Sequence, residues 1–448
     1  MIEVAVIALV FLLFSLFSRR LQNTILTAPI VFVAAGMLLG SEPVKPITIE
    51  QITPYFLLIG STALGLSFFN DASRINPYTL PGNARLPGLL LIIALPLTIL
   101  LGTLVAVWLF PGFTVIEAAL LATIQSPSDA GLIATVVSSR RVPARIRQAI
   151  NVESSLNDGI TTPFAALFTS FAMIKMGSEE VGYQILSPFI QIGLAVLVGF
   201  IVAGAVSWAL RVSDRRRWIS PSFQGMIFPC LTMITLTITY LVGGNYFIAC
   251  FVAGLTAAFV LGNFSDRFSR FSETLEQLFT LIVFLILGTV FVQRIDRMDW
   301  RVILYAVAGI TLLRMLPVAI ALRREKLQRE SILFLGWFGP RGLASVVLGT
   351  IVLSTIPGIP QLETISLTVM AVVVLSVFVH GASSIPLVVW YGRKTHSLSP
   401  DSAENRPVSE IPIRLGWSLL LGGTDERITG WEAEHHSREV KDDSEMQQ

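Results

Sequence analysis

One run of polar residues, Asn151-Val152-Glu153-Ser154-Ser155-Leu156-Asn157-Asp158-Gly159, interrupts a stretch that is otherwise rich in apolar side chains. In a helix, Ser154 and Asp158 lie four residues apart on one face, and Glu153 and Asn157 share the neighbouring face. The first pair offers oxygen atoms, the ligands that hard cations such as Na⁺ and K⁺ take, and the second pair can hydrogen-bond to lock the helix. Because burial penalises a charged carboxylate, a proton and a cation would compete for Asp158. The alternative is that Asp158 is a neutral structural acid.

The rest of the sequence indicates that this run lies in a membrane. Of the 448 residues, 53% are hydrophobic and 14% are charged, and the mean hydropathy is +0.71. Soluble domains carry about 25% charged residues, and a soluble chain of this length could not bury so much apolar surface. The net charge of +2 excludes nucleic-acid binding through bulk charge. Cys230 and Cys250 fit no metal-ligand spacing, and no cofactor is expected.

Thirteen apolar stretches are long enough to cross a bilayer, so the sequence predicts an all-α polytopic membrane protein of about 13 transmembrane helices within residues 1–395. No positive region precedes the first stretch, which indicates a retained helix rather than a cleaved signal peptide. Residues 396–448 are polar and predict a cytoplasmic tail that is partly disordered, in which His435 and His436 are more typical of a solvated segment than of a metal site. The stretches span residues 4–18, 24–40, 51–69, 87–110, 114–138, 146–174, 184–210, 223–242, 244–262, 273–292, 301–322, 331–355 and 362–391.

Basic residues alternate between the gaps that separate these stretches. The odd-numbered gaps and the end of the last helix hold 20 arginines and lysines, whereas the even-numbered gaps hold 5. Since positive charge is retained in the cytoplasm, the pattern predicts a protein of the cell (inner) membrane with its N-terminus outside and its C-terminus inside. A wrong helix count would disturb this alternation.

Two of the predicted helices contain proline and glycine at membrane depth. The fifth contains Gln125-Ser126-Pro127-Ser128-Asp129-Ala130-Gly131, and the twelfth contains Gly336-Trp337-Phe338-Gly339-Pro340-Arg341-Gly342. Non-helical backbone is tolerated in a membrane only where it is buried in protein or lines a cavity. Interrupted helices in corresponding halves of a chain indicate an inverted-repeat transporter with its ion site at the two broken crossing helices. For Asp129, a proline kink with an incidental carboxylate is the alternative.

Other charged residues inside the predicted spans need partners. Arg341 cannot remain unpaired in a bilayer, and Glu153 is its expected partner. Arg314 is expected to pair with a helix end or to act structurally. Asp71 follows the third span and is interpreted as a second carboxylate at a cytoplasmic funnel, as a helix cap, or as the partner of Arg74.

At these residues the chain resembles the NhaP-type Na⁺/H⁺ antiporters, an electroneutral branch of the monovalent cation:proton antiporter family that also includes the animal Na⁺/H⁺ exchangers. The resemblance covers roughly residues 5–390 and leaves the tail uncovered. It implies a homodimer with a scaffold bundle and a moving bundle. Because Asn157 rather than a second aspartate precedes Asp158, it also implies the exchange of one proton per cation. The motifs that carry it are Ser126-Pro127-Ser128-Asp129, Glu153-Ser154-Ser155-Leu156-Asn157-Asp158-Gly159 and Gly339-Pro340-Arg341-Gly342.

The resemblance also implies roles for individual residues. Asp158 is expected to bind the cation and the proton alternately. Ser154 and Ser128 are expected to supply further oxygen ligands to Na⁺ or K⁺, and Asp129 is the acid of the unwound crossing. The residues expected to support this site are Asn157, Glu153 and, as the partner of Glu153, Arg341.

The chain departs from the family pattern at two places. It has Ser128-Asp129-Ala130 where Thr-Asp-Pro is usual, so the hydroxyl is kept and the proline lies two residues upstream, at Pro127. Some members place a ligand glutamate near the third helix, where this chain has Asn70 and Asp71. The fourth ligand of the cation therefore stays open.

The sequence thus predicts a cation/proton antiporter, not an enzyme, that serves pH homeostasis. Its partners are H⁺, a monovalent cation (Na⁺, K⁺ or Li⁺), membrane lipid and a second copy of the chain. A cation channel or uniporter on the same scaffold is the alternative, although the sequence has no repeated selectivity-filter motif. A membrane scaffold or sensor that signals through its tail is a third interpretation. The sequence has no phosphate-binding Gly-x-x-x-x-Gly-Lys-Ser/Thr loop, which disfavours an ATP-driven pump, and His380 as the one histidine within the spans disfavours redox carriage.

Overall fold

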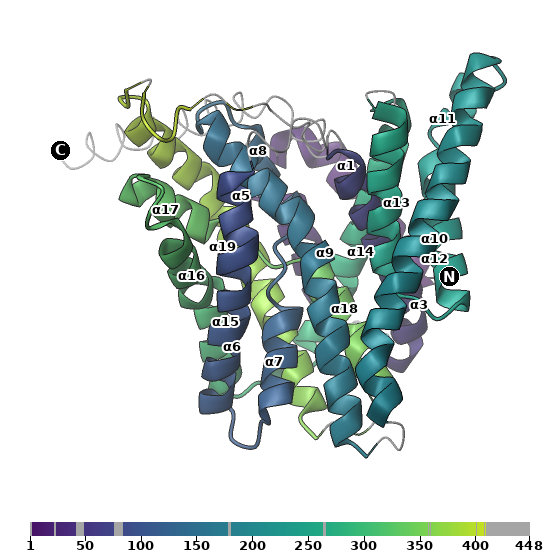
Figure 1. The fold of residues 1–448 in the computed structure, drawn as a ribbon. Helices are drawn as coiled ribbons and strands as arrows, with labels where there is room; N and C mark the ends of the chain where they lie inside the picture. The colour runs from purple at the N-terminus through teal and green to yellow at the C-terminus, as the bar shows by residue number, and fades with distance from the viewer. Residues whose placement is uncertain are drawn as a thin grey trace.

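Figure 1 shows a computed structural model in which residues 2–21, 24–41, 49–75, 84–177, 181–262, 266–356, 358, 360–399, 401–406 and 408 are described. Every regular element within those ranges is a helix, which confirms the predicted all-α class. The first half contains α1 (Ile2–Leu21), α2 (Ala28–Gly40), α3 (Ile49–Ser73), α5 (Arg85–Leu89), the π-helical η1 (Leu90–Ala94), α6 (Leu95–Leu109), α7 (Val115–Ile124), the 3-10 helix η2 (Gly131–Ile133), α8 (Ala134–Ser138), α9 (Ala144–Lys175) and α10 (Val181–Arg215). The second half contains α11 (Pro221–Gln224), α12 (Ile227–Leu241), α13 (Tyr246–Leu261), α14 (Asp266–Val292), η4 (Ile295–Arg297), α15 (Trp300–Ile310), α16 (Leu312–Leu322), α17 (Arg329–Trp337), α18 (Leu343–Thr355) and α19 (Leu362–Thr395).

Each predicted apolar stretch coincides with one of these helices or with a consecutive group of them. The rest of the described helices are shorter, more polar or divided, so the number that cross the bilayer stays a prediction. Within the described ranges, six helical stretches are by length and composition apolar enough to cross a membrane: Arg85–Leu109, Gly182–Arg215, Pro221–Leu241, Phe268–Val292, Trp300–Leu322 and Leu362–Thr395.

The helices form two groups that α9 connects. In one group α2, α3, α10, α12, α13 and α14 pack against one another, and in the other α6, α7, α15, α16, α17 and α19 do so. Figure 1 shows most of the first group on the right and most of the second on the left, with α9 between them. Helix α9 packs on α3, α10 and α13 of the first group and on α7 of the second. The polar run of α9 therefore lies where the two groups meet.

Both predicted interruptions are present, and they lie against each other. Helix α7 ends at Ile124 and η2 begins at Gly131, while α17 ends at Trp337 and α18 begins at Leu343. Figure 1 shows α7 and α18 in the lower half of the bundle and α8 and α17 in the upper half. The amide of Asp129 donates a hydrogen bond of 2.8 Å to the Pro340 carbonyl. Two antiparallel interrupted helices thus cross at their non-helical segments.

The ends of several helices follow from local sequence signals. Thr114 and Glu117 form a reciprocal capping box at the start of α7, in which each side chain accepts the other residue's amide. Asn245 caps α13 through its side-chain oxygen, and Gly243 just before it adopts a positive φ of 75°, which glycine reaches without steric cost. The arginine-bearing connections after α8, after α10 and before α17 lie at the same end of the bundle as the C-terminal end of α19 (Figure 1).

Candidate functional site

Ser154 and Asp158 line one small cavity in the middle of the bundle, as their spacing predicts. Helix α9 runs through both residues without a break, and both side chains are buried. The cavity has a volume of about 10 Å³, close to the space that one water-sized occupant needs. Its oxygen atoms are of the kind that binds a hard cation. The other residues that line it are Leu64, Ser67, Asp71, Pro127, Ser128, Asp129, Ala130, Gly342, Leu343 and Ala344.

Ser128 connects the first interruption to α9. Its hydroxyl lies 3.1 Å from Ser154 Oγ and donates to Glu153 Oε2 over 3.3 Å. Asn157 Nδ2 donates to the same hydroxyl over 2.5 Å and approaches the Ser128 carbonyl at 3.4 Å. Ser154 therefore faces the cavity while Glu153 and Asn157 hold Ser128 in place, which is the arrangement that the two faces of α9 predict.

Asp129 is bound by backbone amides at both carboxylate oxygens. Oδ1 accepts the Gly131 amide over 2.8 Å, and Oδ2 accepts the Leu343 amide over 2.9 Å. Since Leu343 is the first residue of α18, the carboxylate caps that helix at the end where the dipole favours negative charge. A Cβ atom at Gly342 would lie 2.7 Å from Asp129 Cβ, so only glycine admits this close approach. Asp129 thus joins the two interruptions as well as lining the cavity.

The prediction that Arg341 forms an ion pair with Glu153 is wrong. Glu153 Oε2 lies 3.0 Å from Arg314 Nη2 of α16, with both side chains almost completely buried. The Arg341 guanidinium instead donates to the carbonyls of Ser126 and Pro127. The interruption of α7 leaves these carbonyls without a helical donor, and the guanidinium has five N–H groups to offer. Arg341 therefore serves the backbone of the other interruption, and Arg314 compensates the buried acid.

Asp71 of α3 lies in the wall of the same cavity and is buried. Its neighbour along the helix, Arg74, forms an ion pair with Glu273 of α14. Of the interpretations that the sequence leaves open, the cavity position matches a second carboxylate near the site. Asp71 and Asp158 thus approach one cavity from different helices.

A buried polar contact that the sequence did not predict joins α3 and α14. Asn70 Nδ2 donates to Glu276 Oε2 over 2.7 Å, and Ser272 Oγ donates to Asn70 Oδ1 over 2.7 Å. Ser272 and Glu276 are four residues apart on α14 and both are buried. This four-residue spacing at the start of an apolar stretch is the sequence signal that could have predicted the contact.

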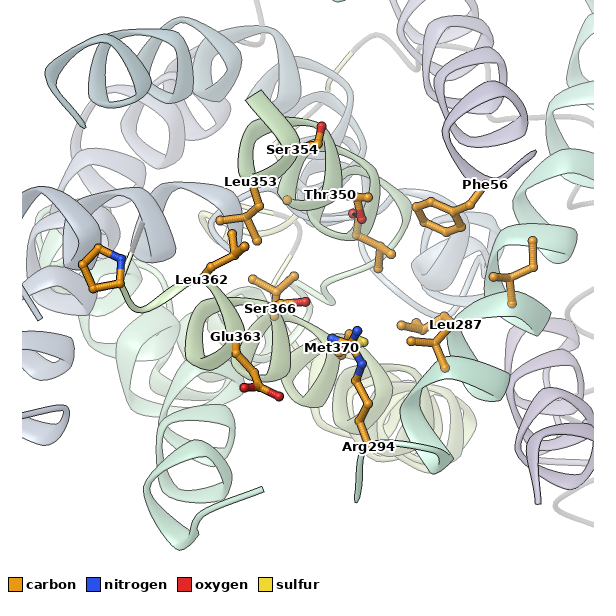
Figure 2. Close-up of a pocket in the computed structure, with 16 residues that line it drawn as sticks. Phe56, Leu287, Arg294, Thr350, Leu353, Ser354, Leu362, Glu363, Ser366 and Met370 are labelled. Carbon is orange, nitrogen blue, oxygen red and sulfur yellow. Dashed lines mark hydrogen bonds between the residues drawn. The ribbon is translucent and has the colours of Figure 1, made fainter. Parts of the chain in front are cut away.

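A larger cavity of about 570 Å³ lies between α3, α14, α18 and α19. Figure 2 shows mainly apolar side chains around it, and the charged residues Arg294 and Glu363 belong to its wall. Glu363 lies in the first turn of α19, whereas Arg393 lies in the last turn, so the cavity lies toward the end of the bundle away from the arginine-rich connections. Helix α18 reaches both cavities, the small one through Leu343 and Ala344 and the large one through Val346, Gly349, Thr350, Leu353 and Ser354.

The sequence matches one protein family over most of its length. The sequence profile of the family described as "Sodium/hydrogen exchanger, transmembrane" matches residues 5–390. The K(+)/H(+) antiporter NhaP of Alkalimonas amylolytica is 24% identical over 401 residues, which are 86% of this chain and 66% of that protein. A Na(+)/H(+) antiporter of Schizosaccharomyces pombe is 25% identical over 323 residues, 63% of this chain and 66% of that protein.

Similarity at the level of structure extends over most of the chain. The sodium proton antiporter MjNhaP1 of Methanocaldococcus jannaschii superposes with a TM-score of 0.71 at 18% identity, covering 88% of this chain and 99% of that one. At this identity the likeness concerns the fold alone. The chain spans about two thirds of the length of the two curated relatives named above, 66% of each.

Proposed function

Because the chain belongs to the transmembrane sodium/hydrogen exchanger family, we propose that it is a secondary antiporter that exchanges Na⁺ or K⁺ for H⁺. The observation that carries the proposal is the one small cavity that Asp158, Ser154 and Ser128 share. These three side chains supply oxygen ligands to a cation that has lost its water. Asp158 takes up a proton when the cation leaves.

The exchange follows from the competition at a single carboxylate. A site that holds either a proton or a cation, and that faces one side of the membrane at a time, couples the two flows without another energy source. The cavity of about 570 Å³ forms the approach from the side away from the arginine-rich connections. Val347 of α18 is buried against Gly60 of α3.

The other buried acids near the site support one proton per cation. Glu153 is compensated by Arg314, and Asp129 is held by the amides of Gly131 and Leu343. Asp158 is the acid that alternates between the proton and the cation. Asp71, which lines the same cavity, adds negative potential and a further oxygen ligand.

The remaining features of the proposal rest on the sequence and on the named relatives. A relative from Bacillus subtilis is named a sodium, potassium, lithium and rubidium/H(+) antiporter, which supports a site that accepts more than one alkali cation, Li⁺ included. The charge alternation supports a cell-membrane protein with a cytoplasmic C-terminus. We include a homodimer and a role in pH homeostasis in the proposal. A channel or uniporter is not supported, since the named relatives are antiporters and the Asp158 cavity has room for about one occupant.

A transport assay tests this function. The purified protein is reconstituted in liposomes that contain a pH-sensitive dye, a proton gradient is imposed, and Na⁺ or K⁺ is added outside in turn. We expect one of these cations to collapse the gradient, with no effect of membrane potential, and Asp158→Asn to be silent. Exchange by the variant at the wild-type rate would refute the site, and cation current without proton movement would refute antiport.

A further inference from the structure

The interruption between α17 and α18 leaves backbone groups that no helical hydrogen bond satisfies. At membrane depth such groups need partners from elsewhere in the protein. Asp129 satisfies two of them, because its amide donates to the Pro340 carbonyl and its carboxylate accepts the Leu343 amide. Two further groups are bound by α19: the carbonyl of Trp337, which also accepts the Gly339 amide over 2.8 Å, and the amide of Arg341.

Ser376 and His380 of α19 make these contacts from one face of the helix, since they are four residues apart. His380 Nε2 lies 3.0 Å from the Trp337 carbonyl, and the Arg341 amide donates to Ser376 Oγ over 2.7 Å. A carbonyl only accepts, so in the tautomer that carries its proton on Nε2 the ring donates to it. His380 Nδ1 lies 3.1 Å from the Ser376 hydroxyl and 3.0 Å from the Ser376 carbonyl. With the proton on Nε2, Nδ1 accepts the hydroxyl proton of Ser376; with the proton on Nδ1, the ring donates to the Ser376 carbonyl instead.

We propose that His380, together with Ser376, is a positioning residue for cation binding, which holds the second interruption at Trp337 and Arg341 and thereby fixes Ser128 at the Asp158 cavity. This inference rests on the proposed antiport. Trp337 precedes the interruption and Arg341 lies within it, so one turn of α19 sets the distance between them. His380 is itself buried and does not line the cavity.

The link from α19 to the cavity consists of contacts on both sides of Ser128. The Arg341 guanidinium binds the carbonyl of Pro127, immediately before Ser128. Asp129, immediately after it, is bound to Pro340 and Leu343. Movement of the second interruption therefore moves the Ser128 hydroxyl relative to α9.

A matched control is a hydrogen bond between the same helices that only stabilises the fold. Tyr391 of α19 donates from its hydroxyl to Ser331 Oγ of α17 over 2.8 Å, in a buried position. This hydrogen bond joins the same two helices but lies away from the interruption. Tyr391→Phe removes one buried hydrogen bond between α17 and α19 and leaves the contacts of Trp337 and Arg341 in place.

The experiment compares wild type, His380→Leu, His380→Gln, Ser376→Ala and Tyr391→Phe in proteoliposomes and in detergent. We expect His380→Leu and Ser376→Ala to raise the apparent KM for the cation roughly tenfold or more, since displacement of a ligand by about 1 Å is costly. The amides of Gly339, Arg341, Gly342 and Leu343 should also exchange faster with deuterium than in wild type. His380→Gln, whose amide nitrogen can donate to the Trp337 carbonyl, should stay within about threefold of wild type, and Tyr391→Phe should change neither readout.

Several outcomes would overturn the inference. One is a His380→Leu protein that folds and has the KM and the amide exchange of Tyr391→Phe. Another is a lower melting temperature of His380→Leu with an unchanged KM, because a residue that only stabilises the fold would give this result. If wild type itself exchanges no cation, the antiport proposal fails. Amide exchange then still tests whether His380 and Ser376 hold the second interruption. Unchanged amide exchange in His380→Leu would reject that role.

Discussion

Arg314 and Glu153 form an ion pair whose side chains are 2% and 1% exposed, with Arg314 Nη2 3.0 Å from Glu153 Oε2. The same carboxylate oxygen accepts the hydroxyl of Ser128. The pair therefore ties α16 to α9 and, through Ser128, to the first interruption. It also compensates an acid that directly precedes Ser154 in the chain, so Glu153 adds no unpaired charge beside Asp158.

Breaking this pair should destabilise the protein strongly. Removing one partner leaves a buried charge alone, which costs about 3–5 kcal/mol. We expect Arg314→Met and Glu153→Gln each to lower the melting temperature in detergent, and the double variant to recover part of the loss. The control is the exposed pair of Arg297 and Glu363, 61% and 56% exposed, since breaking a solvated pair has little effect. A double variant that is as unstable as the two single losses combined would contradict the account.

Gly342→Ala should disturb the crossing of the two interruptions. The added Cβ would lie 2.7 Å from the Cβ and Cγ atoms of Asp129, and overpacking of this kind costs about 1–3 kcal/mol. Since the displaced carboxylate caps α18 and lines the cavity, transport should fall together with the melting temperature. Gly204→Ala in α10 is the control, because nothing lies within 4 Å of a Cβ there. Normal transport by Gly342→Ala would show that the contact with Asp129 does not matter.

Ser128 should contribute a hydroxyl that threonine can replace and alanine cannot. The side chain contacts Ser154, Glu153 and Asn157 around the cavity. We expect Ser128→Ala to raise the apparent KM for the cation about tenfold, as the loss of one ligand or positioning hydrogen bond of about 1.4 kcal/mol would. Ser128→Thr should remain near wild type. Equal KM values for the two variants would exclude the hydroxyl as a ligand and as a positioning group.

The pH dependence of transport should show competition at one site. A proton on Asp158 blocks the cation, so lowering the pH raises the apparent KM, by about tenfold per pH unit once the acid is mostly protonated. The maximal rate at saturating cation should change much less over the same range. Initial rates in proteoliposomes, measured over a pH series at many cation concentrations, check this. A KM that stays constant while the maximal rate falls would indicate a separate regulatory group instead.

The elements that the sequence predicted are those whose cause is local. Apolar stretches mark the helices. Pro127 with Gly131, and Pro340 with Gly339 and Gly342, mark the interruptions, because each signal lies within a few residues of the structure it produces. The two faces of α9 were predicted for the same reason, since helical spacing alone separates Ser154 and Asp158 from Glu153 and Asn157.

The partners of buried charges depend on how distant helices pack, and local patterns do not give this. Arg341 and Arg314 are both buried arginines of the second half, and no spacing shows which of them reaches Glu153. The bond between Asn70 and Glu276 joins residues 206 positions apart. The contacts of His380 likewise join α19 to an interruption some forty positions away, at 43 for the Trp337 carbonyl.

In the proposed cycle, one site at Asp158 holds either a proton or a monovalent cation. This competition is tested most directly by measuring protons released when Na⁺ or K⁺ is added to the purified protein in weak buffer. The account predicts the release of about one proton per bound cation at a pH where the site is protonated, and none from Asp158→Asn. Cation binding without proton release, or unchanged release from Asp158→Asn, would contradict it.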